Sequence, residues 1–138
     1  MDVGLDRHWC ALSGSTRTVT LLDTNALIWV QKSHPRARKV MRDGRLYVSP
    51  ATLLELQYLH EAGKIRLVPG AMRAIVDDDR WAVDDPPPTT WFLKAVELAW
   101  TRDPFDRLIA AHAQVRGWRV ATSDRDLIEH LGAACIEL

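Results

Sequence analysis

Cysteine, net charge and long apolar runs are all scarce in this chain, and each scarcity excludes a class of protein. Only two cysteines occur among 138 residues, and they form no Cys-x-x-Cys pair, which argues against a disulfide framework or a zinc ribbon. No apolar run approaches the roughly 18 residues needed to cross a bilayer. The start of the sequence has no signal-peptide pattern. We therefore expect a soluble protein of the reducing cytoplasm.

The charges of the chain are balanced. Lys plus Arg and Asp plus Glu each number 18, so no overall field attracts nucleic acid, and any such contact must come from a local patch. The length and an apolar content of 47% predict one domain with a single core, over residues 18–138. Residues 1–17 show little periodicity, and we expect them to form a loosely ordered extension outside this domain.

Strand-like apolar runs alternate with helical segments along the chain. Strands are predicted at 19–22, 46–48, 81–83, 118–122 and 134–138. Helices are predicted at 26–31, after Pro35, and at 50–62, 71–78, 90–100, 105–116 and 126–131. The segment 84–88 ends in three prolines and should be a stiff loop that no helix can cross. This alternation predicts an α/β fold with a mainly parallel sheet of four to five strands, covered by helices on both faces.

Four acidic residues lie just past a predicted strand or in the first turns of a helix: Asp23, Glu55, Asp106 and Asp124. Two carboxylates about 5 Å apart, at an effective dielectric of about 20, repel by roughly 3 kcal/mol. A fold keeps such a cluster when something offsets the repulsion, and a divalent cation is the usual answer. The pattern therefore predicts a metal-dependent site of the kind that hydrolyses phosphodiester bonds.

The two acids that follow predicted strands, Asp23 and Asp124, could instead serve only as a helix cap or in a turn. Asp23 can cap the helix that follows it, because aspartate is a leading N-cap residue. Asp124 lies two residues before a second aspartate, Asp126, and a turn accounts for one of the pair. We take Asp124 as the fourth acid because it is nearer the end of the strand, and Asp126 remains the other choice.

The other two acids lie within helices. Asp106 is spaced from Asp103 as in a capping box, which needs no catalysis. However, Ala110 and Ala113 lie on the same face as Asp106 and are small enough to leave room beside it. Glu55 lies in a helix that is apolar on nearly every side, so we expect it to be buried and to need a partner, either a metal ion or an arginine.

Four segments together resemble the PIN-domain ribonucleases, and most closely the VapC-type toxins of bacterial toxin–antitoxin pairs. They are LLDTNALIW (21–29), YVSPATLLEL (47–56), RDPFDRLIAA (102–111) and VATSD (120–124), of which the third is the most specific. Their order and spacing fit across residues 18–138. Asn25 departs mildly from the family, in which histidine is commoner at this position.

The resemblance implies a three-layer α/β/α fold and a divalent-metal-dependent endoribonuclease of a type II toxin–antitoxin system. It implies Mg²⁺ or Mn²⁺ held by the four catalytic acids Asp23, Glu55, Asp106 and Asp124, with Thr24 and Thr122 in support. It also implies a cognate antitoxin that occupies the site, and a homodimer. We expect the antitoxin to insert a basic side chain among the acids.

Basic side chains offer candidate contacts for the RNA backbone. The stretch 32–45 holds six Lys or Arg against one acid, although a solvated helix face is the commoner meaning of such a run. Arg107 and Arg125 each adjoin a candidate acid and could contact phosphate or merely balance charge. The candidates are Arg38, Lys39, Arg42, Arg107 and Arg125.

Two other classes of function stay open at this point. A Mg²⁺-dependent phosphomonoesterase also places an aspartate after its first strand, but the Asp-x-Asp that supplies nucleophile and acid is absent at Asp23-Thr24-Asn25. A non-catalytic module that binds RNA or protein would use the acids only as caps. Metal-linked stability separates both the enzyme classes from the binding module.

Overall fold

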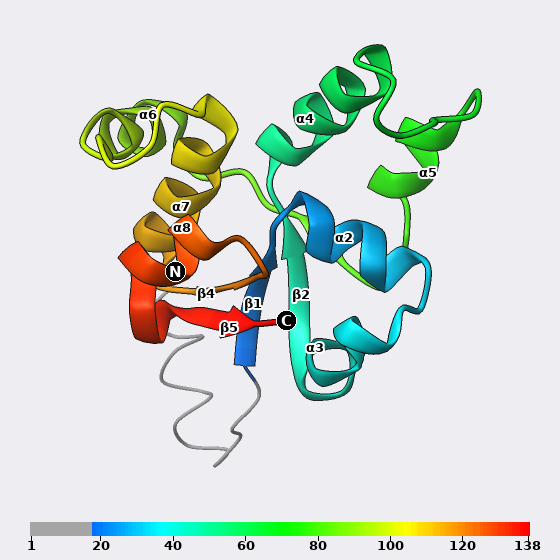
Figure 1. Ribbon diagram of the computed structural model, residues 1–138, viewed down its shortest axis with the longest axis horizontal. Coiled ribbons are helices and arrows are strands. Elements are labelled where there is room, and N and C mark those ends of the chain that lie inside the picture. Colours follow the sequence, from blue (N-terminus) through cyan, green and yellow to red (C-terminus); the bar gives the residue numbers. More distant parts are fainter. Residues whose placement is uncertain (1–17) are drawn as a thin grey trace.

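A computed structural model of the protein describes residues 18–138, and the extension predicted for 1–17 lies outside these residues. No helix in the described part is long and apolar enough to cross a membrane. Strands and helices alternate through most of this part, as the sequence pattern predicts (Figure 1).

Five strands in residues 18–138 form one parallel sheet in the order β3-β2-β1-β4-β5. They are β1 (Thr18–Leu22), β2 (Gly44–Val48), β3 (Ala82–Val83), β4 (Arg119–Thr122) and β5 (Cys135–Glu137). In the central strand β1, Leu22 lies opposite Val48 on one side and Ala121 on the other. All three side chains are completely buried, as expected for a parallel sheet covered on both faces. The predicted fold class is confirmed.

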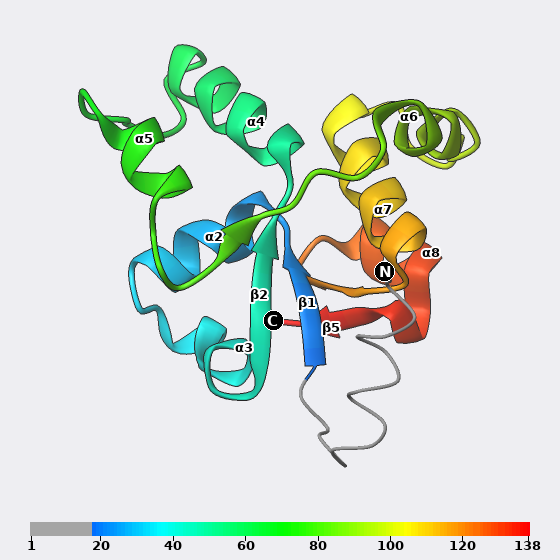
Figure 2. The same ribbon diagram turned by 180° about the vertical axis from the view of Figure 1, so that it is seen from behind.

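Helices cover both faces of the sheet and give the expected three-layer sandwich (Figure 1 and, from behind, Figure 2). On one face, Leu22 and Val48 pack with side chains of α2 (Thr24–Gln31), α3 (Arg38–Asp43) and α5 (Ala71–Val76). On the other face, Leu21 and Val120 pack against α7 (Pro104–Arg116). The remaining elements are α4 (Pro50–Glu61), α6 (Pro88–Val96), α8 (Arg125–Leu131) and the 3-10 turns Pro35–Ala37 and Gly132–Ala134.

Polar side chains begin the helices at the carboxyl edge of the sheet, the edge where the parallel strands end. Asp23 caps α2, Ser49 caps α4 and Asp103 caps α7, each by accepting a hydrogen bond from a backbone N–H of the first turn. Pro50 and Pro104 occupy the first helical position, where an N–H has no partner within the helix. These helix starts agree with the sequence pattern.

Helix α6 differs from the helix predicted at 90–100. It begins at Pro88, inside the proline run, and ends at Val96. Proline is compatible with the first turn of a helix because that N–H is free in any case, so only the first two prolines of the run belong to the loop. Trp100 lies outside the helix, although its side chain still packs against the core.

Helix α4 is far less buried than its apolar sequence predicts, and that prediction is wrong. Its buried residues are Ala51, Thr52 and Leu56, whereas Leu54 is 63% and Tyr58 59% exposed. The reason is its position: α4 continues beyond the end of β2 and away from the sheet (Figure 1). Only one face of the helix therefore finds a packing partner.

Candidate active site

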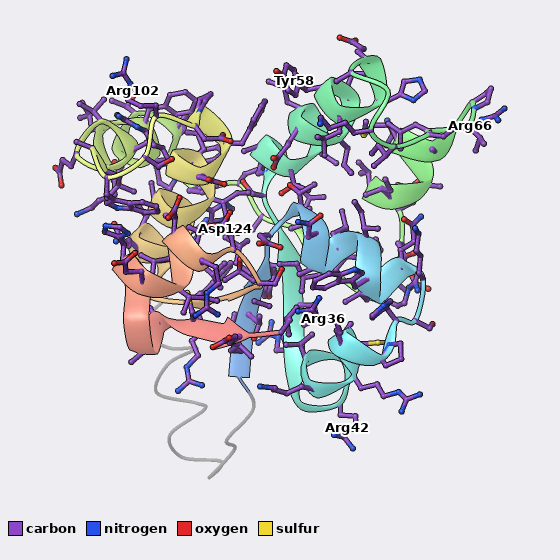
Figure 3. The ribbon with its side chains drawn as sticks, in the orientation of Figure 1. Arg36, Arg42, Tyr58, Arg66, Arg102 and Asp124 are labelled. Carbon is purple, nitrogen blue, oxygen red and sulfur yellow. The ribbon has the colours of Figure 1, made fainter. Side chains whose placement is uncertain are left out.

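The four candidate acids all arise near the carboxyl edge of the sheet. Asp23 directly follows β1, and Asp124 lies two residues after β4, at the start of α8. Glu55 lies in the second turn of α4, which follows β2, and Asp106 lies in the first turn of α7. Figure 3 shows Asp124 beside the end of β4, between the helices that begin at this edge.

Asp23 is the buried member of the group, with only 5% of its surface exposed. One carboxylate oxygen accepts a hydrogen bond of 2.8 Å from the N–H of Ala26. Burial is the main reason that the pKa of Asp23 is raised to about 6, and the charges of Glu55 and Asp124 raise it further. Hydrogen bonds to Thr122 and Ala26 act in the opposite direction. A cap role alone does not explain this accumulation of charge.

Asp106 has a pKa raised to about 7, first by burial and then by four neighbouring carboxylates: Asp103, Asp124, Glu55 and Asp23. No hydrogen bond within residues 18–138 lowers it. Only half of the predicted capping box is formed, because the N–H of Asp103 donates to Thr101 Oγ1 at 3.1 Å rather than to Asp106. The carboxylate of Asp106 is therefore not used as a cap.

Glu55 is half-buried, and its partner is a hydroxyl group. Thr24 Oγ1 donates a hydrogen bond to Glu55 Oε1. Burial raises the pKa of Glu55, the bond from Thr24 lowers it, and the charges of Asp103 and Asp124 raise it again. Among the described residues no arginine or lysine forms a salt bridge with Glu55, so the arginine alternative finds no support there.

Thr122 connects two of the acids. Its Oγ1 atom accepts a hydrogen bond of 2.9 Å from the backbone N–H of Asp124. The same side chain is hydrogen-bonded to the carboxylate of Asp23. Thr24 and Thr122 are both buried, so each holds its acid from the core side. The role of the two threonines as supporting residues of a catalytic site stays a prediction.

Asp124 rather than Asp126 lies in the acidic group. The carboxylate of Asp124 caps α8 by accepting hydrogen bonds from Asp126 N and Leu127 N, at 2.9 and 3.1 Å. Its charge also raises the pKa of Asp23 and Asp106. Asp126 is exposed, and its charge affects neither of these acids. Asp124 therefore caps α8 and at the same time belongs to the group of acids.

Asp103 is a fifth acid at this edge, for which the sequence pattern predicts only the role of a helix cap. It does cap α7, but its charge is also the largest electrostatic cause that raises the pKa of Glu55 and of Asp106. The sequence does contain a signal for this proximity. Asp103 and Asp106 are three residues apart at a helix start, and residues with this spacing lie close together.

Ala110 and Ala113, which lie above Asp106 on α7, belong to the hydrophobic core. Both are buried: Ala110 belongs to the cluster that includes Ala51 of α4, and Ala113 packs with Leu21 of β1. Their small size lets α7 approach the sheet and α4 closely. Asp106 itself is only partly buried, and the access expected beside it stays a prediction.

The donor set fits a hard divalent cation in its chemistry, because it consists of carboxylate oxygens that repel one another. The carboxylates are not close enough together to form a complete metal site. Within residues 18–138, no three His, Cys, Asp or Glu side chains form a group that could hold a metal ion. Hydrogen bonds to the protein hold Asp23, Glu55 and Asp124 in their own places. Asp106 has no such restraint from the described residues.

The candidate RNA contacts come from three helices, α3, α7 and α8. Arg107 donates from Nε to the carbonyl of Thr101 at 2.8 Å, and Arg125 pairs with Glu137 at 3.0 Å. Helix α3 leads into β2 and so lies at the amino edge, away from the acids, where Figure 3 places Arg42. Lys39 of the same helix nevertheless donates to the carbonyl of Glu137, at the carboxyl end of β5, at 3.1 Å, and Arg38 is exposed. The RNA roles of all five stay predictions.

Known proteins support the same fold. A toxin–antitoxin complex from Klebsiella pneumoniae is similar with a TM-score of 0.63 and 16% identity, covering 86% of this chain and 99% of that one. VapBC2 from Rickettsia felis, bound to a DNA fragment from its promoter, has a TM-score of 0.60 and 19% identity, covering 88% and 98%. PAE2754 from Pyrobaculum aerophilum has a TM-score of 0.58 and 20% identity, covering 88% and 92%.

No curated protein matches the chain. The model of the PIN domain family, however, matches residues 20–132, which include all five acids at the carboxyl edge. The fold, the acidic edge and this match agree with the resemblance seen in the four segments. The chain belongs to the PIN domain family.

Proposed function

We propose that this protein is a divalent-metal-dependent endoribonuclease, and that it is the toxin of a type II toxin–antitoxin system. PIN domains are generally nucleases. The observation that carries the proposal is the state of Asp106, whose pKa is raised to about 7 by burial and by the charges of four other carboxylates. A group of negative charges without a compensating cation among the described residues is a site prepared for a cation.

Mg²⁺ or Mn²⁺ would be held by Asp23, Glu55, Asp106 and Asp124. When bound, the ion would supply Lewis-acid chemistry, polarising the phosphate and lowering the pKa of a water molecule. The chain's own residues prepare the acids for it. Thr24 holds Glu55, and Thr122 holds Asp23 and the backbone of Asp124. Such hydrogen bonds keep ligand oxygens oriented before an ion arrives.

A protein partner with a basic side chain would also relieve the repulsion among the acids. Two of the similar structures are described as a toxin–antitoxin complex and as VapBC2 bound to promoter DNA. The outer face of α6 supports a protein partner, because Phe92, Leu93 and Val96 are all more than half exposed. We therefore propose a cognate antitoxin that reaches the acidic edge, and a second copy of the chain as a further partner.

The proposal is tested by cleavage of cellular RNA by the purified protein with Mg²⁺ or Mn²⁺. Asp23→Asn and Asp106→Asn should each abolish cleavage while the variants stay folded. Asp126→Asn is the matched control, because Asp126 is an exposed aspartate near the same edge, and it should retain activity. Cleavage that survives in both Asp23→Asn and Asp106→Asn would refute the site.

The partner is tested separately by co-expression with the product of an adjacent reading frame. We expect the two proteins to co-purify and the mixture to be inactive as a nuclease. Replacing the basic residues of the partner one at a time should restore cleavage at one position. A chain that is purified alone and is freely active beside its neighbour's product would contradict the antitoxin proposal.

A further inference from the structure

Two aromatic side chains, Tyr58 of α4 and Phe105 of α7, contact each other next to the acids. Their ring centroids lie 5.8 Å apart, with the ring planes at 46°. Tyr58 follows Glu55 by three residues on α4, about one helical turn, and Phe105 directly precedes Asp106. The pair therefore connects the two helices that present Glu55 and Asp106. Figure 3 shows Tyr58 on the part of α4 that extends away from the sheet.

Tyr58 and Phe105 lie outside the hydrophobic core. Neither ring belongs to, or packs against, the buried clusters that hold the described part together. Leu54 precedes Tyr58 by one helical turn, and both are mostly exposed. The three residues Leu54, Tyr58 and Phe105 thus form an apolar rim beside a charged site. Exposed apolar side chains gathered in one place are a sign of a binding surface.

An RNA that approaches this edge meets repulsion from the acids. The chain has no net positive charge to offset that repulsion. Arg107, the cation nearest to Asp106 in sequence, already donates to the carbonyl of Thr101. Stacking of a base on an aromatic ring requires no positive charge and works for every base. The apolar rim supplies the kind of attraction that the acidic edge itself cannot.

We propose that Tyr58 and Phe105 form a stacking platform for one unpaired base of the RNA, next to the phosphodiester bond that is cut. This inference rests on the nuclease function proposed above and names the part of the substrate that the protein holds. Both rings are positioning residues: they keep the strand near Glu55 and Asp106 and take no part in bond cleavage. A base stacked on the platform has left its duplex, so single-stranded segments are preferred.

The test uses the full-length protein and a short single-stranded RNA that carries one 2-aminopurine. Tyr58→Leu and Phe105→Leu keep apolar bulk but remove an aromatic face, whereas Tyr58→Phe keeps the ring. We expect each leucine variant to raise KM by roughly 5- to 100-fold with little change in kcat. The quenching of 2-aminopurine fluorescence on binding should weaken in the leucine variants and return in Tyr58→Phe. Val68→Ala is the control, an exposed apolar side chain in the loop between α4 and α5, and should behave as wild type.

Each outcome separates the platform from the nuclease function. If wild type cuts RNA but Tyr58→Leu keeps its KM and its quenching, the platform is overturned and the nuclease function stands. If wild type never cuts RNA but still quenches the probe through Tyr58, the nuclease function fails and the platform is supported. If Tyr58→Leu weakens binding of a protein partner and leaves RNA binding unchanged, the rim is a protein surface and the platform is overturned.

Discussion

The Nε2 atom of His112 lies 2.7 Å from Asp84 Oδ2, which joins the middle of α7 to the loop that follows β3. Arg116 donates to the same carboxylate from Nε at 2.8 Å and from Nη2 at 3.2 Å. His112 is fully buried, and burial lowers its pKa, which favours the neutral ring; a neutral ring with its proton on Nε2 donates to this carboxylate. Because α7 also carries Asp106, this network fixes the helix on which a candidate acid is mounted.

Asp84→Asn should lower the free energy of unfolding by about 2–4 kcal/mol, because the change leaves the largely buried guanidinium of Arg116 without its counter-charge. Urea unfolding of the two proteins at neutral pH measures the difference. Asp85→Asn is the matched control, since Asp85 is exposed and adjacent, and it should cost little. Equal losses in the two variants would show that the network does not hold α7.

The raised pKa of Asp106 predicts that its removal stabilises the protein at high pH. In the unfolded chain this carboxyl ionises near its ordinary value of 3.8, and in the folded protein only near 7. A raised pKa contributes stability at low pH that is lost as pH rises through the folded value. Without divalent ions, Asp106→Asn should therefore be more stable than wild type at pH 8 by on the order of 1–2 kcal/mol, allowing for solvent screening.

Comparing Asp106→Asn with wild type at low pH tests whether the charge of Asp106 causes the difference in stability. Well below pH 3.8 the carboxyl is protonated in both states, so the advantage of Asp106→Asn should disappear. Urea unfolding across the pH range measures it. An advantage that is equal at pH 4 and pH 8 would assign the effect to packing rather than to charge.

Divalent cations should stabilise the wild-type protein. An ion that binds only the folded state at 100 times its Kd adds about 2.7 kcal/mol, which appears as a higher Tm. Millimolar Mg²⁺ or Mn²⁺ should therefore raise Tm, and Asp106→Asn should lose most of that rise. Asp126→Asn should keep it. A rise of the same size in Asp106→Asn would mean that the ion binds elsewhere.

Thr24→Val should reduce cleavage by about 10- to 100-fold, because Glu55 loses the hydrogen bond that orients its carboxylate and lowers its pKa. Valine keeps the branched shape of threonine and lacks its hydroxyl, so the substitution removes the hydrogen bond to Glu55. Thr24→Ser restores the donor and should recover most of the activity. Initial rates measured across the pH range should show the acid limb of the profile moved to higher pH in Thr24→Val alone.

The sequence is most informative about features that depend on neighbouring residues. Asp23, Ser49 and Asp103 each cap a helix where the local pattern predicts a helix start. The parallel sheet follows from the alternation of strands and helices. The helix starts depend on hydrogen bonds within a few residues, which a linear pattern records directly.

Features that depend on distant residues could not be predicted in this way. Leu54 is exposed because α4 extends past the sheet, which its own apolar sequence does not reveal. The contact between His112 and Asp84 joins residues 28 positions apart. The charge of Asp103 acts on Glu55 only once α4 and α7 meet. Each of these three features can be predicted only when the positions of the helices relative to the rest of the fold are known.

The pairing of β1 with β4 has a consequence for synthesis on the ribosome. Asp23 and Glu55 emerge early, but β4, which completes the central part of the sheet and positions Asp124, is made in the last part of the chain. A nascent chain that ends before β4 therefore carries Asp23, Glu55 and Asp106 without the strand that positions Asp124. The acidic edge is therefore completed only after β4 has been synthesised.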